Sequence, residues 1–219
     1  MPNGYYNIYH VIYIIIMDGQ SYKVILVGDT GVGKSSIIHR YIYGKKPPTM
    51  RPTIGAAYYL KEYTIDNKTI RINIWDTAGQ EKFRSLVNIY YKQTKGCVCV
   101  FDITRRNSFE NLNHWIGNYK RYCNINNGKV IVVANKCDYD KSLWCVTEDE
   151  IIQLCQEHDC QYVFTSSFNG QGIDEIFIKI IEEIVECPLT QNPILDENAN
   201  KGYIVELTSK IIPKLPTWC

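Results

Sequence analysis

The sequence of 219 residues lacks the features of membrane-spanning, nucleic-acid-binding and zinc-binding proteins. Its apolar run near the N-terminus, Val11 to Met17, is far shorter than the roughly 20 residues of a membrane-spanning helix. The net charge is only +1, which argues against nucleic-acid binding through bulk electrostatics. The nine cysteines form no paired C-x-x-C units, so the spacing typical of a zinc site is missing, and scattered thiols suit a reducing cytosol.

Composition and length favour one packed domain with extensions at both ends. Hydrophobic residues make up 45% of the chain, which is enough to build a core. We expect residues 21–187 to form that domain and residues 188–219 to form a flexible tail, rich in Pro and Asn. Residues 1–20 are expected to be a spurious or loose N-terminal extension, with Met17 as the start of the native chain.

A phosphate-binding loop is predicted at Gly28 to Ser35, which reads G-x-x-x-x-G-K-S. An apolar, β-branched stretch precedes it at residues 22–27, and helical spacing of apolar residues follows it at residues 35–42. Glycines let the backbone N–H groups point at phosphate oxygens, next to the positive end of a helix. Lys34 can reach the β- and γ-phosphates, and the Ser35 hydroxyl can ligate Mg²⁺. A chance glycine turn is the alternative, and the flanking strand and helix argue against it.

The other segments predict an α/β fold. Apolar or alternating runs predict strands at residues 58–65, 69–75, 97–102, 129–134 and 161–164. Helical patterns cover residues 108–122 and about 173–187, and a capping box, Thr147 to Glu150, opens another helix. Alternating strands and helices predict a doubly wound, mostly parallel six-stranded sheet with helices on both faces. Ligands of such sheets bind at the carboxyl ends of the strands.

A base-binding motif is predicted at Asn135-Lys136-Cys137-Asp138, directly after a buried strand. A carboxylate at this place can accept hydrogen bonds from the ring N–H and the exocyclic amine of guanine. Adenine lacks that pair of donors, so Asp138 favours GTP over ATP. By itself the motif could equally be a polar loop, but its place downstream of a phosphate loop favours a nucleotide site.

Between residues 22 and 187 the chain carries, in order, the motifs GDTGVGKS, PTIGAAY, WDTAGQEKF, NIYY, FDIT and NKCD. Through these motifs it resembles the small GTPases of the Ras superfamily, and within it the Rab family. The PTIGAAY stretch is most similar to the endosomal branch. The resemblance implies a GTP/GDP switch that hydrolyses GTP with Mg²⁺ and recruits effectors in membrane trafficking, on the cytosolic face of endomembranes. Two alternatives stay open: a GTP-binding module with little useful hydrolysis, and a P-loop ATPase or kinase, against which Asp138 argues.

The resemblance also assigns roles to individual residues. It implies catalytic roles for Gln80, which would orient the attacking water, and for Lys34 and Thr53. It implies Mg²⁺ ligation by Ser35, Thr53 and Asp76, and no residue plainly supplies a catalytic arginine in cis. The implied nucleotide-binding residues are Asp29, Thr30, Gly31, Val32, Gly33, Lys34, Ser35, Ser36, Thr53, Gly79, Asn135, Lys136, Asp138, Ser166, Ser167 and Phe168.

Partners are implied by the same resemblance. Effectors would read the switch regions and the aromatic residues Tyr58, Trp75 and Tyr90, although these rings could instead be core aromatics that cover the sheet. An exchange factor and a GTPase-activating protein are also implied. A lipid on Cys219 would attach the chain to a membrane. Rabs usually end in paired cysteines, whereas here a lone cysteine ends the chain without a C-a-a-X box.

Two positions near the predicted guanine site depart from the family pattern. The family usually has an aromatic residue where this chain has Lys46, and a lysine where it has Phe168. The two residue types are therefore exchanged. We expect Phe168 to supply the aromatic contact to the base, with the Lys46 ammonium on solvent or on an aromatic face. Drift at a loosely packed rim is the alternative.

Overall fold

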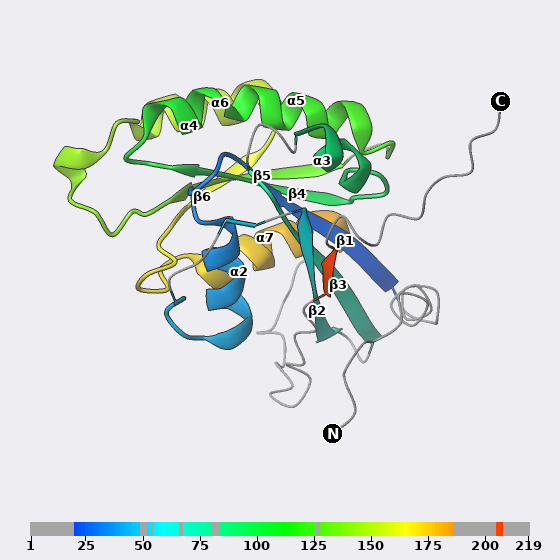
Figure 1. Ribbon diagram of the computed structural model, residues 1–219. Coiled ribbons are helices and arrows are strands. Elements are labelled where there is room, and N and C mark those ends of the chain that lie inside the picture. Colours follow the sequence, from blue (N-terminus) through cyan, green and yellow to red (C-terminus); the bar gives the residue numbers. More distant parts are fainter. Residues whose placement is uncertain are drawn as a thin grey trace.

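The computed structural model describes residues 20–48, 52–53, 55–65, 68–79, 84–125, 128–185 and 205–207, which form a layered α/β fold (Figure 1). The strands of its sheet lie in the order β6-β5-β4-β1-β3-β2-β7. Their bounds are β1 Gln20–Val27, β2 Ala56–Ile65, β3 Lys68–Thr77, β4 Gly96–Asp102, β5 Lys129–Asn135, β6 Gln161–Thr165 and β7 Val205–Leu207. Neighbours from β6 through β1 to β3 are parallel, and β2 runs antiparallel to β3.

The predicted six-stranded, mostly parallel sheet is confirmed, and a short seventh strand extends it. Strand β7 pairs antiparallel with residues 56–58 of β2. It belongs to the segment 188–219, which the sequence predicts to be a flexible tail. The other residues of that tail, including Cys219, lie outside the described residues, as do residues 1–19 of the predicted extension 1–20, with Met17. Gln20, the last residue of that extension, is the first residue of β1.

Helices cover both faces of the sheet (Figure 1). Helices α2 (Lys34–Tyr43) and α7 (Ile173–Val185) lie on one face. The other face carries α3 (Arg84–Tyr90), α4 (Arg106–Glu110), α5 (Leu112–Tyr122) and α6 (Glu148–His158), and a short 3₁₀ turn, η2 (Lys141–Leu143), precedes α6. Among the described residues no helix has both the length and the apolar character needed to cross a membrane.

Two hydrophobic layers follow from the alternation of side chains along the strands. Val24 and Leu26 of β1 pack in the layer under α2 and α7, whereas Ile25 and Val27 pack in the layer under α5 and α6. Because both faces are covered, such strands are apolar at successive positions, which is the pattern seen in the sequence. The core thus holds β1 rigidly, and the loop after it is placed by that strand.

The helices differ from the prediction in two places. The helix predicted at residues 108–122 is divided into α4 and α5 at Asn111, whose side-chain amide donates to Asp29 Oδ2 at 2.7 Å. Helix α3 was not predicted.

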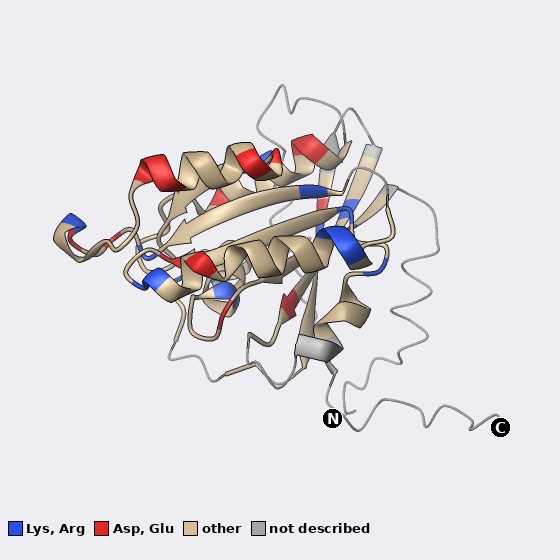
Figure 2. Cartoon of the chain, turned by 90° about the horizontal axis from the view of Figure 1, so that it is seen from above, with Lys and Arg blue, Asp and Glu red and all other residues tan. Residues whose placement is uncertain are grey.

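The capping box before α6 is confirmed, and Arg106 of α4 pairs with Glu150 of α6 at 2.5 Å. Basic and acidic residues both occur along these elements (Figure 2).

Candidate functional site

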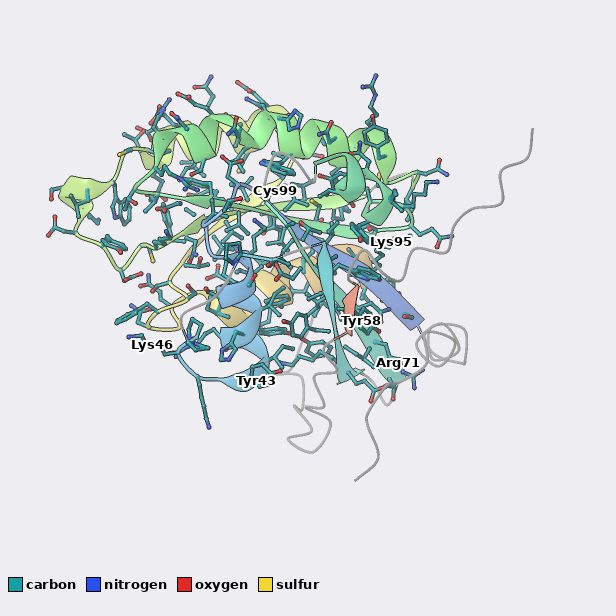
Figure 3. The ribbon with its side chains drawn as sticks, viewed as in Figure 1. Tyr43, Lys46, Tyr58, Arg71, Lys95 and Cys99 are labelled. Carbon is teal, nitrogen blue, oxygen red and sulfur yellow. The ribbon has the colours of Figure 1, made fainter. Side chains whose placement is uncertain are left out.

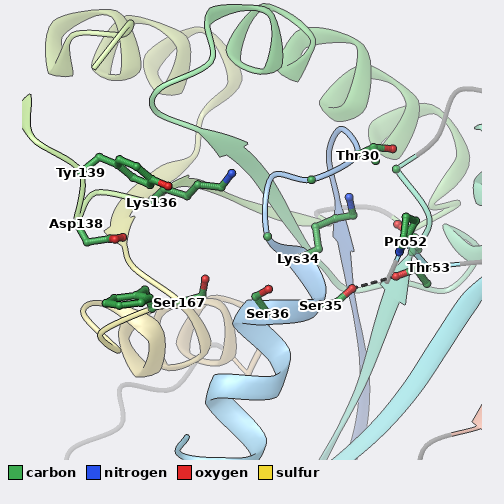
Figure 4. A pocket seen from close by; sticks show the side chains of 15 residues that line it. Thr30, Lys34, Ser35, Ser36, Pro52, Thr53, Lys136, Asp138, Tyr139 and Ser167 are labelled. Carbon is green, nitrogen blue, oxygen red and sulfur yellow. Dashed lines mark hydrogen bonds between the residues drawn. The ribbon is translucent and has the colours of Figure 1, made fainter. Parts of the chain in front are cut away.

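A cleft of about 390 Å³ opens at the carboxyl ends of the strands (Figure 4). It is built by the loop between β1 and α2, the segment 52–53, the end of β3, and the loops after β5 and β6. Strand β1 lies between β3 and β4, where the strand order reverses, which is the usual ligand position in such sheets. The lining residues are Thr30, Gly31, Gly33, Lys34, Ser35, Ser36, Pro52, Thr53, Thr77, Gly79, Lys136, Asp138, Tyr139, Ser167 and Phe168.

The loop between β1 and α2 is held from below by Asn135. The Asn135 amide, fully buried at the end of β5, donates to the carbonyl of Val32 at 2.7 Å. Gly33 has φ +104°, and a Cβ there would lie 2.2 Å from Asn135 Nδ2, so only glycine fits. The first turn of α2 lines the cleft. The N–H groups of a helix's first turn have no partner within the helix, and such groups bind phosphate.

Lys34 places a buried cation beside this loop. Its ammonium donates to the carbonyls of Gly28 and Asp29 at 2.7 and 2.8 Å. Burial lowers the pKa of Lys34 to about 8, while the carboxylates of Asp76 and Asp29 act in the opposite direction. An anion in the cleft would stabilise the charged form of this lysine, as a phosphate group does.

Ser35, Thr53 and Asp76 form a cluster of oxygen atoms next to Lys34. The Ser35 hydroxyl donates to Asp76 Oδ2 at 2.5 Å. It also lies 3.0 Å from Thr53 Oγ1, a contact that Figure 4 shows. Asp76 Oδ1 is buried, and no described residue forms a hydrogen bond with it. Burial raises the pKa of Asp76, whereas the hydrogen bond from Ser35 and the charge of Lys34 act to lower it. Two hydroxyls and a carboxylate are the hard ligands that Mg²⁺ prefers, so these residues fit that ion.

Gly79 brings the segment after β3 against the phosphate loop. A Cβ at Gly79 would lie 2.5 Å from the Gly28 carbonyl oxygen and from the Asp29 carbonyl carbon. The two backbones are thus in contact beside the cleft, and a side chain at Gly79 would separate them. Gln80 lies outside the described residues, so its place near the cleft stays a prediction.

The opposite end of the cleft carries the predicted base-binding residues. The Ser166 hydroxyl donates to Asp138 Oδ1 at 2.6 Å, which orients that carboxylate. Lys136 reaches back to Asp102 at the end of β4, with 2.6 Å between Nζ and Oδ2. Ser167 contributes its backbone N–H at 3.3 Å to Asn135 Oδ1, so the loop after β6 and the phosphate loop share one anchor.

Several predicted residues support the cleft without lining it. The Asp29 carboxylate accepts hydrogen bonds from Asn111 and from the Trp115 indole N–H, at 2.7 and 3.0 Å, and so fixes the phosphate loop to α5. Val32, Asn135 and Ser166 also lie behind the lining residues. The side chains of Asp29 and Asn135 thus hold the loops that line the cleft.

Sequence reasoning missed a few residues of the site. Tyr139, half exposed, lines the cleft directly after Asp138, and its position next to the motif was the available signal. Arg105 donates to the carbonyl of Thr30 at 2.8 Å, so an arginine does lie at the edge of the phosphate loop. No local pattern connects residues 75 positions apart, which is why this contact was not predicted.

The three aromatic residues predicted to meet effectors lie in one row. The ring of Trp75 is 5.5 Å from that of Tyr58 and 5.6 Å from that of Tyr90. Tyr58 is only 4% exposed, and its hydroxyl donates to Asn73 Oδ1 at 2.5 Å. Trp75 and Tyr90 are half-buried. Tyr58 is thus as buried as a core aromatic residue, whereas Trp75 and Tyr90 expose part of their rings to solvent.

Comparisons with known proteins place the chain among small GTPases. The family model described as "Ras family" matches residues 23–186. The chain is similar to a protein described as a "probable Rab-related GTPase" of Acanthamoeba polyphaga mimivirus, with 42% identity over 89% of this chain and 87% of that protein. It is also similar to the Ras-related protein Rab-18 of Caenorhabditis elegans and that of Caenorhabditis briggsae, each with 36% identity over 76% of this chain and 81% of the relative.

Proposed function

Because the chain belongs to the Rab family of small GTPases within the Ras superfamily, we propose that the cleft described above is its GTP and GDP site. Members of this family are GTPases that bind the nucleotide with Mg²⁺ and act as switches. One observation carries the assignment to this cleft. Lys34 and the oxygen cluster of Ser35, Thr53 and Asp76 lie at one end, and the oriented carboxylate of Asp138 lies at the other.

At the phosphate end, we assign binding to Lys34 and to the N–H groups that open α2. Ser35, Thr53 and Asp76 would hold Mg²⁺, which when bound offsets the charge of the phosphate oxygens. Gln80 would orient the attacking water. Side-chain contacts with Ser35 and Asp76 join Thr53 to this cluster, so its position would respond to the γ-phosphate, and effectors would read that difference.

At the base end, Asp138 is proposed to select guanine. Asp138→Asn should weaken GDP binding and improve the binding of xanthosine diphosphate, because the amide can donate to the oxygen that replaces the guanine amine. Competition against a fluorescent GDP measures both affinities. Asp149→Asn, at an exposed position of α6, is the matched control. An unchanged preference in Asp138→Asn would contradict the assignment.

Two alternatives from the sequence are separated by assays on the unaltered chain. A P-loop ATPase or kinase would bind ATP at least as well as GTP in the same competition. A GTP-binding module without useful hydrolysis would retain GTP in a single-turnover assay of phosphate release. Release of phosphate from GTP, accelerated by an activating protein, supports the switch.

The proposal also includes attachment to a membrane and a role in membrane trafficking. We assign the chain to the cytosolic face of endomembranes, with effectors contacting the switch regions, Trp75 and Tyr90, and Tyr58 supporting those rings. Attachment would use a lipid on Cys219. A Cys219→Ser chain should leave the membrane fraction of cells that express it, and equal fractionation of variant and parent would remove this part of the proposal.

A further inference from the structure

Lys46 and Phe168 come from distant parts of the chain and meet at the edge of the cleft. Lys46 follows α2, and Phe168 lies in the loop between β6 and α7. The Lys46 ammonium stands 3.8 Å from the centroid of the Phe168 ring. Figure 3 shows Lys46 next to that loop. Phe168 is 55% exposed and lines the cleft, whereas Lys46 is outside the lining residues.

A second contact joins the same two segments. Arg40, on α2, donates to the carbonyl of Asn169 at 2.6 Å. A Cβ at Gly170 would lie 2.7 Å from Arg40 Nη2, so the guanidinium packs directly on the backbone of this loop. The loop that presents Phe168 is therefore tied to α2 by Arg40 and to the chain after α2 by Lys46.

We propose that Lys46 and Phe168 form a clasp over the base end of the cleft, in which Phe168 stacks on the purine and Lys46 holds the ring from outside. The inference rests on the proposed nucleotide site. Phe168 is the binding residue, and Lys46 is a positioning residue that acts through it. The family usually has an aromatic residue at the position of Lys46 and a lysine at the position of Phe168. The clasp exchanges these two residue types and joins the same two segments of the chain.

The clasp would make nucleotide release depend on the segment that carries Thr53. Lys46 precedes Thr53 by seven positions, with Pro47, Pro48 and Pro52 between them. Because only a few residues separate Lys46 from Thr53, a displacement of Thr53 can reach Lys46. A displaced Lys46 leaves the Phe168 ring without its cation, and the stacked base is then less well held.

Stacking does not depend on the hydrogen-bonding groups at the edge of a base. This property distinguishes the effect of losing the clasp from the effect of changing Asp138. Hypoxanthine keeps the flat ring of guanine but lacks the exocyclic amine. Loss of the clasp should therefore accelerate the release of GDP and of inosine diphosphate by the same factor. A change at Asp138 should instead alter the ratio of the two rates.

The test is the dissociation rate of GDP with a fluorescent group on its ribose, measured on the full chain with Mg²⁺. Phe168→Ala should release GDP roughly tenfold faster or more. Lys46→Met, which keeps the stem and loses the charge, should release it roughly two- to fivefold faster, and Lys46→Arg should keep the parent rate. The Lys46→Met effect should vanish in the Phe168→Ala background. Lys45→Met, at the exposed neighbouring position, is the control.

Three outcomes would overturn the clasp. The first is a GDP release rate in Phe168→Ala equal to that of the parent. The second is a Lys46→Met effect that persists when Phe168 is alanine, because Lys46 would then act independently of the ring. The third is an unequal effect on GDP and inosine diphosphate. A parent chain that does not retain GDP contradicts the proposed nucleotide site itself, so the two failures are distinguishable.

Discussion

Replacing Asn135 by alanine should weaken the core of the protein and the nucleotide site together. Asn135 is fully buried, and its side chain makes three hydrogen bonds with described residues. Its Nδ2 donates to the Val32 carbonyl at 2.7 Å, and its Oδ1 accepts from Thr165 Oγ1 at 3.2 Å and from Ser167 N at 3.3 Å. One side chain therefore connects the phosphate loop with the loop after β6.

The size of the effect follows from these contacts. A typical hydrogen bond contributes about 0.5–1.5 kcal/mol net, and a buried partner left unsatisfied costs about 1–3 kcal/mol. Because Val32 and Thr165 are fully buried and Ser167 is half-buried, we expect Asn135→Ala to lower the free energy of unfolding by roughly 2–4 kcal/mol. The free energy of unfolding of a protein domain is roughly 5–15 kcal/mol in total, so the expected loss is large without abolishing the fold.

Urea unfolding of the nucleotide-free chain measures the stability, and fluorescent GDP measures the release rate. Release should be at least about tenfold faster, since the two loops lose their shared anchor. Asn118→Ala, on the exposed face of α5, is the matched control. Asn135→Asp keeps the acceptor but directs a carboxylate oxygen at the Val32 carbonyl, so it should be at least as damaging. A stability change below about 0.5 kcal/mol with an unchanged release rate would refute the reasoning.

Three other predictions concern hydrolysis, metal and pH. Gln80→Leu should keep GTP affinity and slow phosphate release, and equal single-turnover rates in variant and parent would argue against a water-orienting role. Ser35→Asn should require more Mg²⁺ to retain GTP, because the amide is a bulkier and poorer ligand, and tight GTP binding at low Mg²⁺ would exclude Ser35 as ligand. Burial lowers the pKa of Lys23 to about 8, whereas the unfolded value is about 10.4, so the unfolded state binds more protons between these values. The free energy of unfolding should therefore rise with pH in that window, and Lys23→Met should reduce the slope; identical slopes would contradict this.

Local patterns in the sequence were sufficient for the phosphate loop, the central strands and the last two helices. Gly28 to Ser35 is a contiguous motif, and the strand before it and the helix after it follow from apolar spacing over a few residues. The capping box of α6 depends on residues three positions apart, so it too could be predicted. The prediction that the nucleotide carries guanine was based on Asp138 and its place after a buried strand.

Tertiary structure decided the contacts between segments that are distant in sequence. Asp29 is engaged by Asn111 and Trp115, more than 80 positions away, and this determines which way its carboxylate points. The division of α4 from α5 and the pairing of β7 with β2 likewise depend on neighbours in space. The resemblance to the family indicated that Lys46 stands where an aromatic residue is usual and Phe168 where a lysine is usual. Only the packing of the β6–α7 loop against the end of α2 placed the Lys46 ammonium on the Phe168 ring. Patterns in the chain specify which face of an element is buried, whereas the partner across a loop is set by the register and packing of the whole domain.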